Sequence, residues 1–77
     1  MLRVAVESST MVSVGYEGKG RILEIEFTSG AVYQYLDVPA RVHKELMQAE
    51  SKGRYFNSEI RDTYNYQPVG RAKAAGR

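Results

Sequence analysis

Within the expected strand at residues 21–27, residues 23–27 alternate strictly between apolar and polar side chains, and this pattern constrains the fold most. In an extended chain Leu23, Ile25 and Phe27 point to one side, and the two glutamates between them point to the other. Such alternation is typical of an antiparallel strand with one buried and one solvated face. The sequence therefore predicts a sheet that has a polar side and an apolar side covered by another layer.

The preceding segment, residues 10–16, has the same period of two. Its Val12, Val14 and Tyr16 share one face, which predicts a strand. Two glycines within residues 17–20 can take positive φ, so the chain can reverse there. The two segments are thus expected to form a hairpin.

The following segment, residues 31–36, alternates again after a turn at residues 28–30. Tyr33 and Tyr35 share a face of this third strand. A three-stranded antiparallel β-meander results. Residues 64–66 add a further expectation, a short C-terminal edge strand that ends before Pro68.

A helix is predicted after the third strand. Pro39 cannot donate to a strand ladder but fits the first turn of a helix. Within residues 40–52, Val42 and Leu46 begin an apolar stripe, while charged residues occupy the other side. Gly53 is expected to end this helix in a left-handed conformation.

A second, shorter helix is predicted next, because Phe56 and Ile60 lie four residues apart and can both reach the core. The expected fold class is α+β, with the meander followed by two short helices on one face. Residues 1–69 should form one domain. Residues 70–77 contain no side chain larger than alanine except basic ones, and they are expected to be a disordered basic tail.

The chain has 77 residues, no cysteine and one histidine. A domain of this size buries a small core, and neither a disulfide nor a structural zinc site can reinforce it. Association with a partner or a second copy is one way to gain stability. The first residues lack the apolar run of a signal peptide and no segment is long enough to span a bilayer, so a cytoplasmic location is expected.

Positive charge is concentrated toward the C-terminus. Residues 1–50 contain five Lys or Arg against seven acidic residues, whereas residues 51–77 contain six against two. This asymmetry favours an anionic partner, although a solvated surface with a basic tail explains it as well.

Basic and aromatic side chains alternate around Gly53, with Lys52 and Arg54 beside it and Tyr55 next. Basic groups bind phosphates and aromatic rings stack on bases, so together they suit single-stranded nucleic acid. The N-terminal N–H groups of the short helix could add to a phosphate site that includes Arg61. The alternative is that the basic residues only solubilise a helix junction.

Several short motifs recur in an order that resembles the KTSC domain, a small domain named for its place at the C-terminus of some lysyl-tRNA synthetases. The resemblance spans residues 6–69, and the sequence matches the form that occurs alone in short bacterial and phage proteins. The motifs are Ser8-Ser9, Val12-Ser13-Val14-Gly15-Tyr16, Leu23-Glu24-Ile25-Glu26-Phe27, Gly30, Tyr33-Gln34-Tyr35, Val38-Pro39, Leu46-Met47, Ser51-Lys52-Gly53-Arg54-Tyr55-Phe56-Asn57, Ile60-Arg61 and Tyr64. The resemblance implies RNA binding only through the synthetase context. Asn65 stands where the family often has proline, and the basic tail is not part of the pattern.

Tyr33 and Tyr35 could offer two consecutive stacking platforms, about 6.5–7 Å apart along the strand. Tyrosine is equally a normal half-buried strand residue, and at least one of the two is expected to be structural. Which face the helices cover decides between these readings. Tyr55 is the better stacking candidate, because Phe56 beside it should point into the core.

Catalysis is not predicted. His43 is the one histidine and has no cysteine beside it to act as a nucleophile. Glu24 and Glu26 could bind a divalent cation with a third carboxylate, but alternating glutamates on a solvated strand face more often serve solubility. No metal or cofactor site is predicted.

Two functions remain open at this stage. The first is a non-catalytic module that binds RNA or single-stranded nucleic acid through Lys52, Arg54, Tyr55 and Arg61, with Tyr33 and Tyr35 as further candidates. The second is a protein-interaction or dimerisation module that pairs an exposed edge strand.

Overall fold

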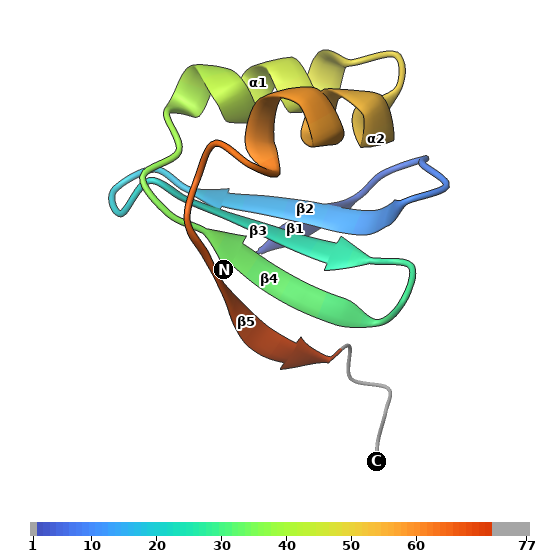
Figure 1. The fold of residues 1–77 in the computed structure, drawn as a ribbon, viewed down its shortest axis with the longest axis horizontal. Helices are drawn as coiled ribbons and strands as arrows, with labels where there is room; N and C mark the ends of the chain where they lie inside the picture. The colour runs from blue at the N-terminus through green and yellow to red at the C-terminus, as the bar shows by residue number, and fades with distance from the viewer. Residues whose placement is uncertain (1, 72–77) are drawn as a thin grey trace.

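The computed structural model of the protein describes residues 2–71. Five strands form one antiparallel sheet in the order β1-β2-β3-β4-β5, and the helices lie together on one of its faces (Figure 1). The strands are β1 (Arg3–Ala5), β2 (Met11–Glu17), β3 (Ile22–Phe27), β4 (Ala31–Tyr35) and β5 (Tyr66–Arg71). The α+β class is therefore as predicted.

The helix layer consists of α1 (Ala40–Gln48) and α2 (Lys52–Tyr55), which continues into one wide π-helical turn, η1 (Phe56–Ile60). Two pairs of apolar residues point from this layer into the core, as the sequence predicted: Val42 and Leu46 from α1, and Phe56 and Ile60 from η1. They pack on the apolar side of β3. Within residues 2–71, no helix has the length and apolar character needed to cross a membrane.

The sheet has five strands, so the predicted three-stranded meander is too small. β1 was not predicted, because three residues carry too little alternation to indicate a strand. β5 runs to Arg71 and includes Pro68, whereas the predicted edge strand covered residues 64–66. Pro68 is tolerated because β5 is an edge strand, and the register against β4 shifts between Val32 and Tyr33.

The length of β5 also bears on the predicted tail. Gly70 and Arg71 are the first two residues of the predicted tail. They belong to the sheet, where they pair with Val32 and Ala31 of β4. Residues 72–77 lie outside the described part of the chain.

Strand β2 contains an irregularity that simple alternation does not reveal. Its register against β3 shifts between Met11 and Ser13, which is the pattern of a β-bulge at Val12. As a result Met11 lies in the core beside Val14, while Val12 is 42% exposed. The prediction that Val12 shares a face with Val14 was wrong for this reason.

Gly53 does not end α1 as predicted. That helix stops at Gln48, and Ser51 begins α2 by accepting a hydrogen bond from the backbone N–H of Arg54 at 3.3 Å. Gly53 lies inside α2, where a Cβ would come within 2.7 Å of Thr10 Oγ1. Glycine is needed here for close approach of the helix to the start of β2, not for a left-handed φ.

The turn between β2 and β3 also differs from expectation. The residue with positive φ there is Arg21, at 58°, and not one of the glycines.

Candidate nucleic-acid interface

A groove of about 550 Å³ lies between the sheet and η1. Strands β3, β4 and β5 supply one wall, and η1 with the turn after it supplies the other. We call this the aromatic groove. The side chains that give it its chemistry are Phe27, Tyr33, Tyr35, Phe56, Arg61 and Tyr66.

The rings of the aromatic groove contact one another edge-on or at a tilt. Tyr33 lies 5.8 Å from Phe27 and 5.1 Å from Tyr66, measured between ring centroids, and Tyr66 lies 5.4 Å from Tyr35. Tyr66 is 54% exposed. Because the rings of Tyr33 and Tyr66 are inclined by 59°, they do not form a parallel slot, and a planar ligand would stack on one ring at a time.

Tyr33 and Tyr35 point to the side of the sheet that the helices cover, since they pair with Ile25 and Leu23 of β3. Tyr35 is 4% exposed and packs edge-on against Phe56. Burial, reinforced by Tyr66 and Tyr33, raises the pKa of Tyr35 to about 12. Tyr35 is therefore a core residue that forms the floor of the groove, whereas Tyr33 is half-buried at its side. The two tyrosines do not act as consecutive platforms.

Arg61 brings positive charge to the aromatic groove. It follows η1 and is exposed. Its guanidinium lies close enough to Tyr35 to lower the pKa of that phenol, but the opposite effect of burial is larger. Asp62 lines the same groove. The groove thus combines aromatic rings with one cation and one anion at its rim.

Lys52 and Arg54 lie in a second groove of about 680 Å³, between α2 and the segment that precedes β2. We call it the polar groove. Glu7 and Glu50 line it as well, so its two cations are balanced by two anions. The Lys52 ammonium also donates a hydrogen bond to the Ala49 carbonyl at 3.3 Å. The predicted basic junction is therefore a groove of mixed charge, not a uniformly positive patch.

The two grooves are adjacent, because Thr10 lines both of them. η1 separates them: Phe56 faces the aromatic groove, and Asn57 and Ser58 face the polar groove.

Tyr55 lines neither groove. Its hydroxyl donates a hydrogen bond to Glu45 Oε1 of α1 at 2.7 Å, and its ring packs against the core. Burial together with this hydrogen bond raises the pKa of Tyr55 to about 12. The residue shares only a shallow hollow with Arg54. The six candidate residues thus fall into three places: Lys52 with Arg54, Arg61 with Tyr33 and Tyr35, and Tyr55 by itself.

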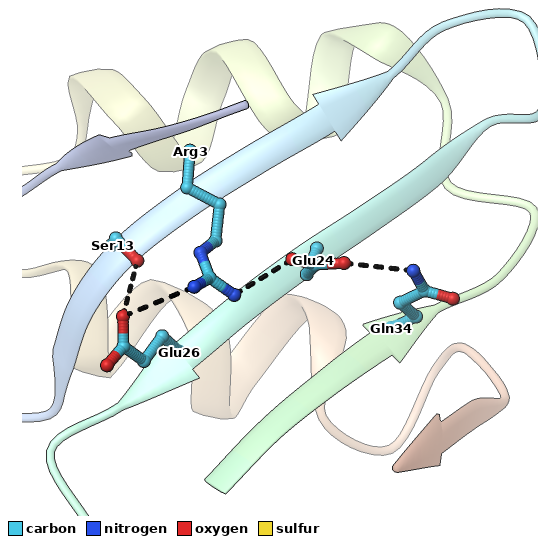
Figure 2. Close-up of polar contacts among 5 residues, drawn as sticks. All are labelled: Arg3, Ser13, Glu24, Glu26 and Gln34. Carbon is cyan, nitrogen blue, oxygen red and sulfur yellow. Dashed lines mark hydrogen bonds and ion pairs between the residues drawn. The ribbon is translucent and has the colours of Figure 1, made fainter. Parts of the chain in front are cut away.

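The second face of the sheet carries a polar cluster in which Arg3 lies across β2 and β3 (Figure 2). Its guanidinium contacts Glu24 Oε2 at 2.8 Å and Glu26 Oε1 at 3.6 Å. Ser13 donates a hydrogen bond to Glu26 at 2.9 Å, and the Gln34 amide donates one to Glu24 at 2.9 Å. Glu24 is only 9% exposed, so this face is less solvated than the alternation implied.

Arg3 occupies the space between the two carboxylates and supplies the positive charge there (Figure 2). Glu24 and Glu26 thus act as structural partners of β1. Among residues 2–71, no group of three or more side chains is arranged to hold a metal ion.

His43 packs against the sheet and not into either groove. Its ring stacks on Tyr16 at 4.9 Å with an angle of 8° between the planes, and the Tyr16 hydroxyl donates to the Val38 carbonyl at 2.6 Å. Burial lowers the pKa of His43 below its usual 6.5.

Comparison with known sequences now identifies the family. The family model of the KTSC domain matches residues 7–64, which is most of the chain. The chain belongs to the KTSC domain family. The motifs around Tyr33, Pro39 and Gly53 all lie inside the matched segment.

Relatives of this KTSC domain occur in two settings. An uncharacterised protein of Stutzerimonas stutzeri (strain A1501) is 51% identical over 57 residues, which cover 74% of this chain and 80% of that protein. A lysine–tRNA ligase of Nostoc punctiforme is 41% identical over 63 residues, which cover 82% of this chain but 11% of the ligase. The chain therefore spans about a tenth of the enzyme it matches.

The fold is shared with a solved structure. A crystal structure of a KTSC domain protein from Yersinia pestis superposes with a TM-score of 0.88 at 42% identity, over 90% of this chain and 97% of that one. The arrangement of one sheet covered by helices on one face is thus that of the KTSC domain.

Sequence reasoning did not include Tyr66 among the site candidates, although it is the most exposed ring of the aromatic groove. The available signal was its position in the short edge strand predicted at residues 64–66. Pairing of Tyr66 with Tyr35 across β4 and β5 brings the three tyrosines together.

Proposed function

We propose that this KTSC domain binds single-stranded RNA, with a base stacked in the aromatic groove and neighbouring phosphates held by basic side chains. The observation that carries the proposal is the exposed Tyr66 ring, which lies beside Tyr33 with Arg61 in the same groove. Stacking on an aromatic ring needs an unpaired base and tolerates any sequence. The function is therefore recognition of unpaired nucleotides without base-specific readout.

The size of the groove agrees with a ligand of this kind. A volume of about 550 Å³ lies within the usual range of small-ligand sites, and the tilted rings leave the outer face of Tyr66 open. Tyr35 and Phe56 close the floor, so a bound base would contact apolar surface there.

Charge supports the same proposal. Residues 51–77 contain six Lys or Arg against two acidic residues. Arg61 lines the aromatic groove together with the rings, and Lys52 and Arg54 lie in the adjoining polar groove. Both grooves contain acidic side chains as well, Asp62 in the aromatic groove and Glu7 and Glu50 in the polar groove. Arg61 is expected to matter more than Lys52 or Arg54 because it shares its groove with the stacking rings.

The names of two relatives support RNA as the class of nucleic acid. The lysine–tRNA ligases of Nostoc punctiforme and Trichormus variabilis, each 41% identical over 63 residues, are named for action on tRNA. A domain that holds unpaired nucleotides would serve such an enzyme as an accessory RNA contact.

The test is a salt series of binding to tRNA and to a short single strand, with Tyr66→Ala and Arg61→Gln as variants. Loss of one stacking platform should weaken binding by about 5- to 150-fold. Arg61→Gln should reduce the slope of log affinity against log salt by about one unit. Arg41→Gln is the matched control, because Arg41 is exposed on α1 and lines neither groove.

Two comparisons complete the design. A chain that ends at Arg71 keeps all of β5 and removes residues 72–77, so binding that persists belongs to the folded domain. Thermal unfolding of each variant shows that it is folded. Equal affinity of Tyr66→Ala and the unaltered chain, or absence of binding at low salt, would contradict the proposal.

A further inference from the structure

The two edges of the sheet differ in how well they are protected against pairing with another strand. The β5 edge contains Pro68, and its register against β4 shifts between Val32 and Tyr33. Gly70 in the same strand has a φ of 138°. Proline and irregular register both prevent a further strand from adding to an edge. The β5 edge is therefore protected.

The β1 edge carries none of these features in its described residues. Arg3, Val4 and Ala5 pair with Gly15, Val14 and Ser13 in an unbroken register. The backbone N–H of Val6 donates to the Val12 carbonyl at 3.1 Å, which extends the same register. The backbone N–H and C=O groups of an antiparallel strand alternate in direction from one residue to the next. Those of Val4 and Val6 therefore point toward β2, and those of Arg3 and Ala5 point away from the sheet.

The side chains of the β1 edge are also suited to contact with another strand. Leu2 is 92% exposed and Val4 is 59% exposed, although Val4 pairs with the buried Val14 on the helix side of the sheet. The helix layer does not cover them. Two apolar residues are therefore exposed next to the unpaired backbone groups of Arg3 and Ala5.

The charge of Arg3 does not oppose contact between two copies. Its guanidinium is bound by Glu24 and Glu26 on the other face of the sheet (Figure 2). A strand that pairs with β1 therefore meets a backbone and two apolar side chains, with the charge of Arg3 already neutralised.

We propose that a second copy of this chain pairs with β1, antiparallel and related by a two-fold axis at Val4. Arg3 then lies opposite Ala5 of the second copy, and each of these outward-pointing pairs exchanges two backbone hydrogen bonds. Val4 lies opposite its own counterpart, and Leu2 lies opposite Val6. The two sheets join into one, and the exposed Leu2 and Val4 of both copies form a single apolar cluster.

A second copy fits this edge because the segment is complementary to itself. Under the two-fold axis, outward-pointing backbone groups of one copy lie opposite outward-pointing backbone groups of the other, and apolar side chains lie opposite apolar side chains. A symmetric dimer requires this self-complementarity. Only three residues of each copy belong to β1, so the association is weak and depends on concentration. It leaves the aromatic groove open, since that groove lies at the β3, β4 and β5 side of the sheet.

Single cysteines test this arrangement, because the chain has none of its own. Residues directly opposite in a non-hydrogen-bonded pair lie about 4.5 Å apart at Cα, which a disulfide can bridge. Val4→Cys should therefore form a disulfide-linked dimer under mild oxidation. Val69→Cys on β5 is the matched control, because Val69 is 52% exposed at the protected edge.

Pairing at Val4 raises the local thiol concentration within the dimer to about the millimolar range. At a protein concentration that populates the dimer, Val4→Cys should therefore cross-link at least about tenfold faster than Val69→Cys. Sedimentation equilibrium of the cysteine-free chain should show a monomer–dimer equilibrium. Val4→Lys should abolish the dimer, because two ammonium groups would meet at the axis, and Val69→Lys should not. The chain is used at full length with any affinity tag at its C-terminus.

Equal cross-linking of the two cysteine variants would overturn the proposal. So would a chain that is monomeric at the highest concentration reached, or a dimer that Val69→Lys dissolves and Val4→Lys does not. A strand of a different protein bound at β1, with no self-association, would also count against it. Circular dichroism and thermal unfolding confirm that each variant is folded before its association is compared.

Discussion

The two faces of the sheet are built from alternate residues of the same strands, yet they are stabilised in opposite ways. On the helix face Leu23 and Ile25 are 0% exposed and belong to the hydrophobic core. On the other face Glu24 is 9% exposed, with Arg3 and Gln34 as its partners. The helix face is covered by another layer, whereas the polar face is covered by side chains of the sheet itself. Stability of the polar face therefore depends on β1.

The largest expected effect lies on the helix face. Leu23→Ala should lower the free energy of unfolding by about 2–5 kcal/mol, because it leaves a cavity between β3 and the helices. Ile60→Ala should lower the free energy of unfolding by a similar amount, because Ile60 enters the same core from η1. Val12→Ala is the matched control, since this valine is 42% exposed at the bulge and should change stability by less than about 1 kcal/mol. Urea unfolding measures all three, and equal effects would show that the core is placed wrongly.

A smaller effect is expected on the polar face. Arg3→Met keeps the aliphatic stem and removes the charge, and it should cost about 1–2 kcal/mol, between the values for exposed and for buried ion pairs. The side chains of Arg3 and Glu24 are 27% and 12% exposed, which supports this intermediate value. A double-mutant cycle with Glu24→Gln isolates the pair. Arg41→Met provides the control, and strict additivity within the cycle would mean that the ion pair contributes nothing.

The smallest effect concerns pH. Burial holds the pKa of His43 below 6.5, so the unfolded chain takes up a proton at higher pH than the folded chain does. The free energy of unfolding should therefore fall as pH decreases through 6.5, and it should stop falling below the folded-state pKa.

NMR titration of the single histidine measures that pKa directly, and denaturant unfolding between about pH 7.5 and pH 5 measures the change in stability. The variant His43→Gln should lack the decrease in this range. A histidine pKa at or above 6.5 in the folded protein would contradict the prediction.

The central part of the fold could be predicted from local pattern. Alternation in β3 and β4 gives two central strands, and four-residue spacing places Phe56 and Ile60 in the core. Each of these signals depends on neighbours in the sequence. Strand β1, the bulge in β2 and the full length of β5 could not be found in this way, because they depend on contacts between distant residues.

Strand β1 illustrates this limit. Arg3 is fixed by Glu24, which lies 21 positions away, and it crosses Gly15, where a Cβ would come within 2.9 Å of Arg3 Cγ. Neither partner is recognisable from the local sequence. The bulge at Val12 is a second case, since it shifts register without any glycine or proline to mark it.

The candidate site shows the same contrast. The alternation of basic and aromatic residues around Gly53 suggested one continuous surface, but a helix turns successive side chains by about 100°. Tyr55 therefore points to Glu45, while Lys52 and Arg54 line the polar groove. The aromatic groove forms instead from Tyr33, Tyr66 and Arg61, which only the pairing of β4 with β5 and the packing of η1 bring together.

The contact between Gly53 and Thr10 has a mechanical consequence for both grooves. A Cβ on Gly53 would lie 2.7 Å from Thr10 Oγ1, so the second helix lies closer to the start of β2 than any residue with a side chain would allow without a shift. Thr10 lines the aromatic groove and the polar groove alike. The two grooves therefore share this residue, so a ligand that displaces Thr10 in either groove changes the shape of the other.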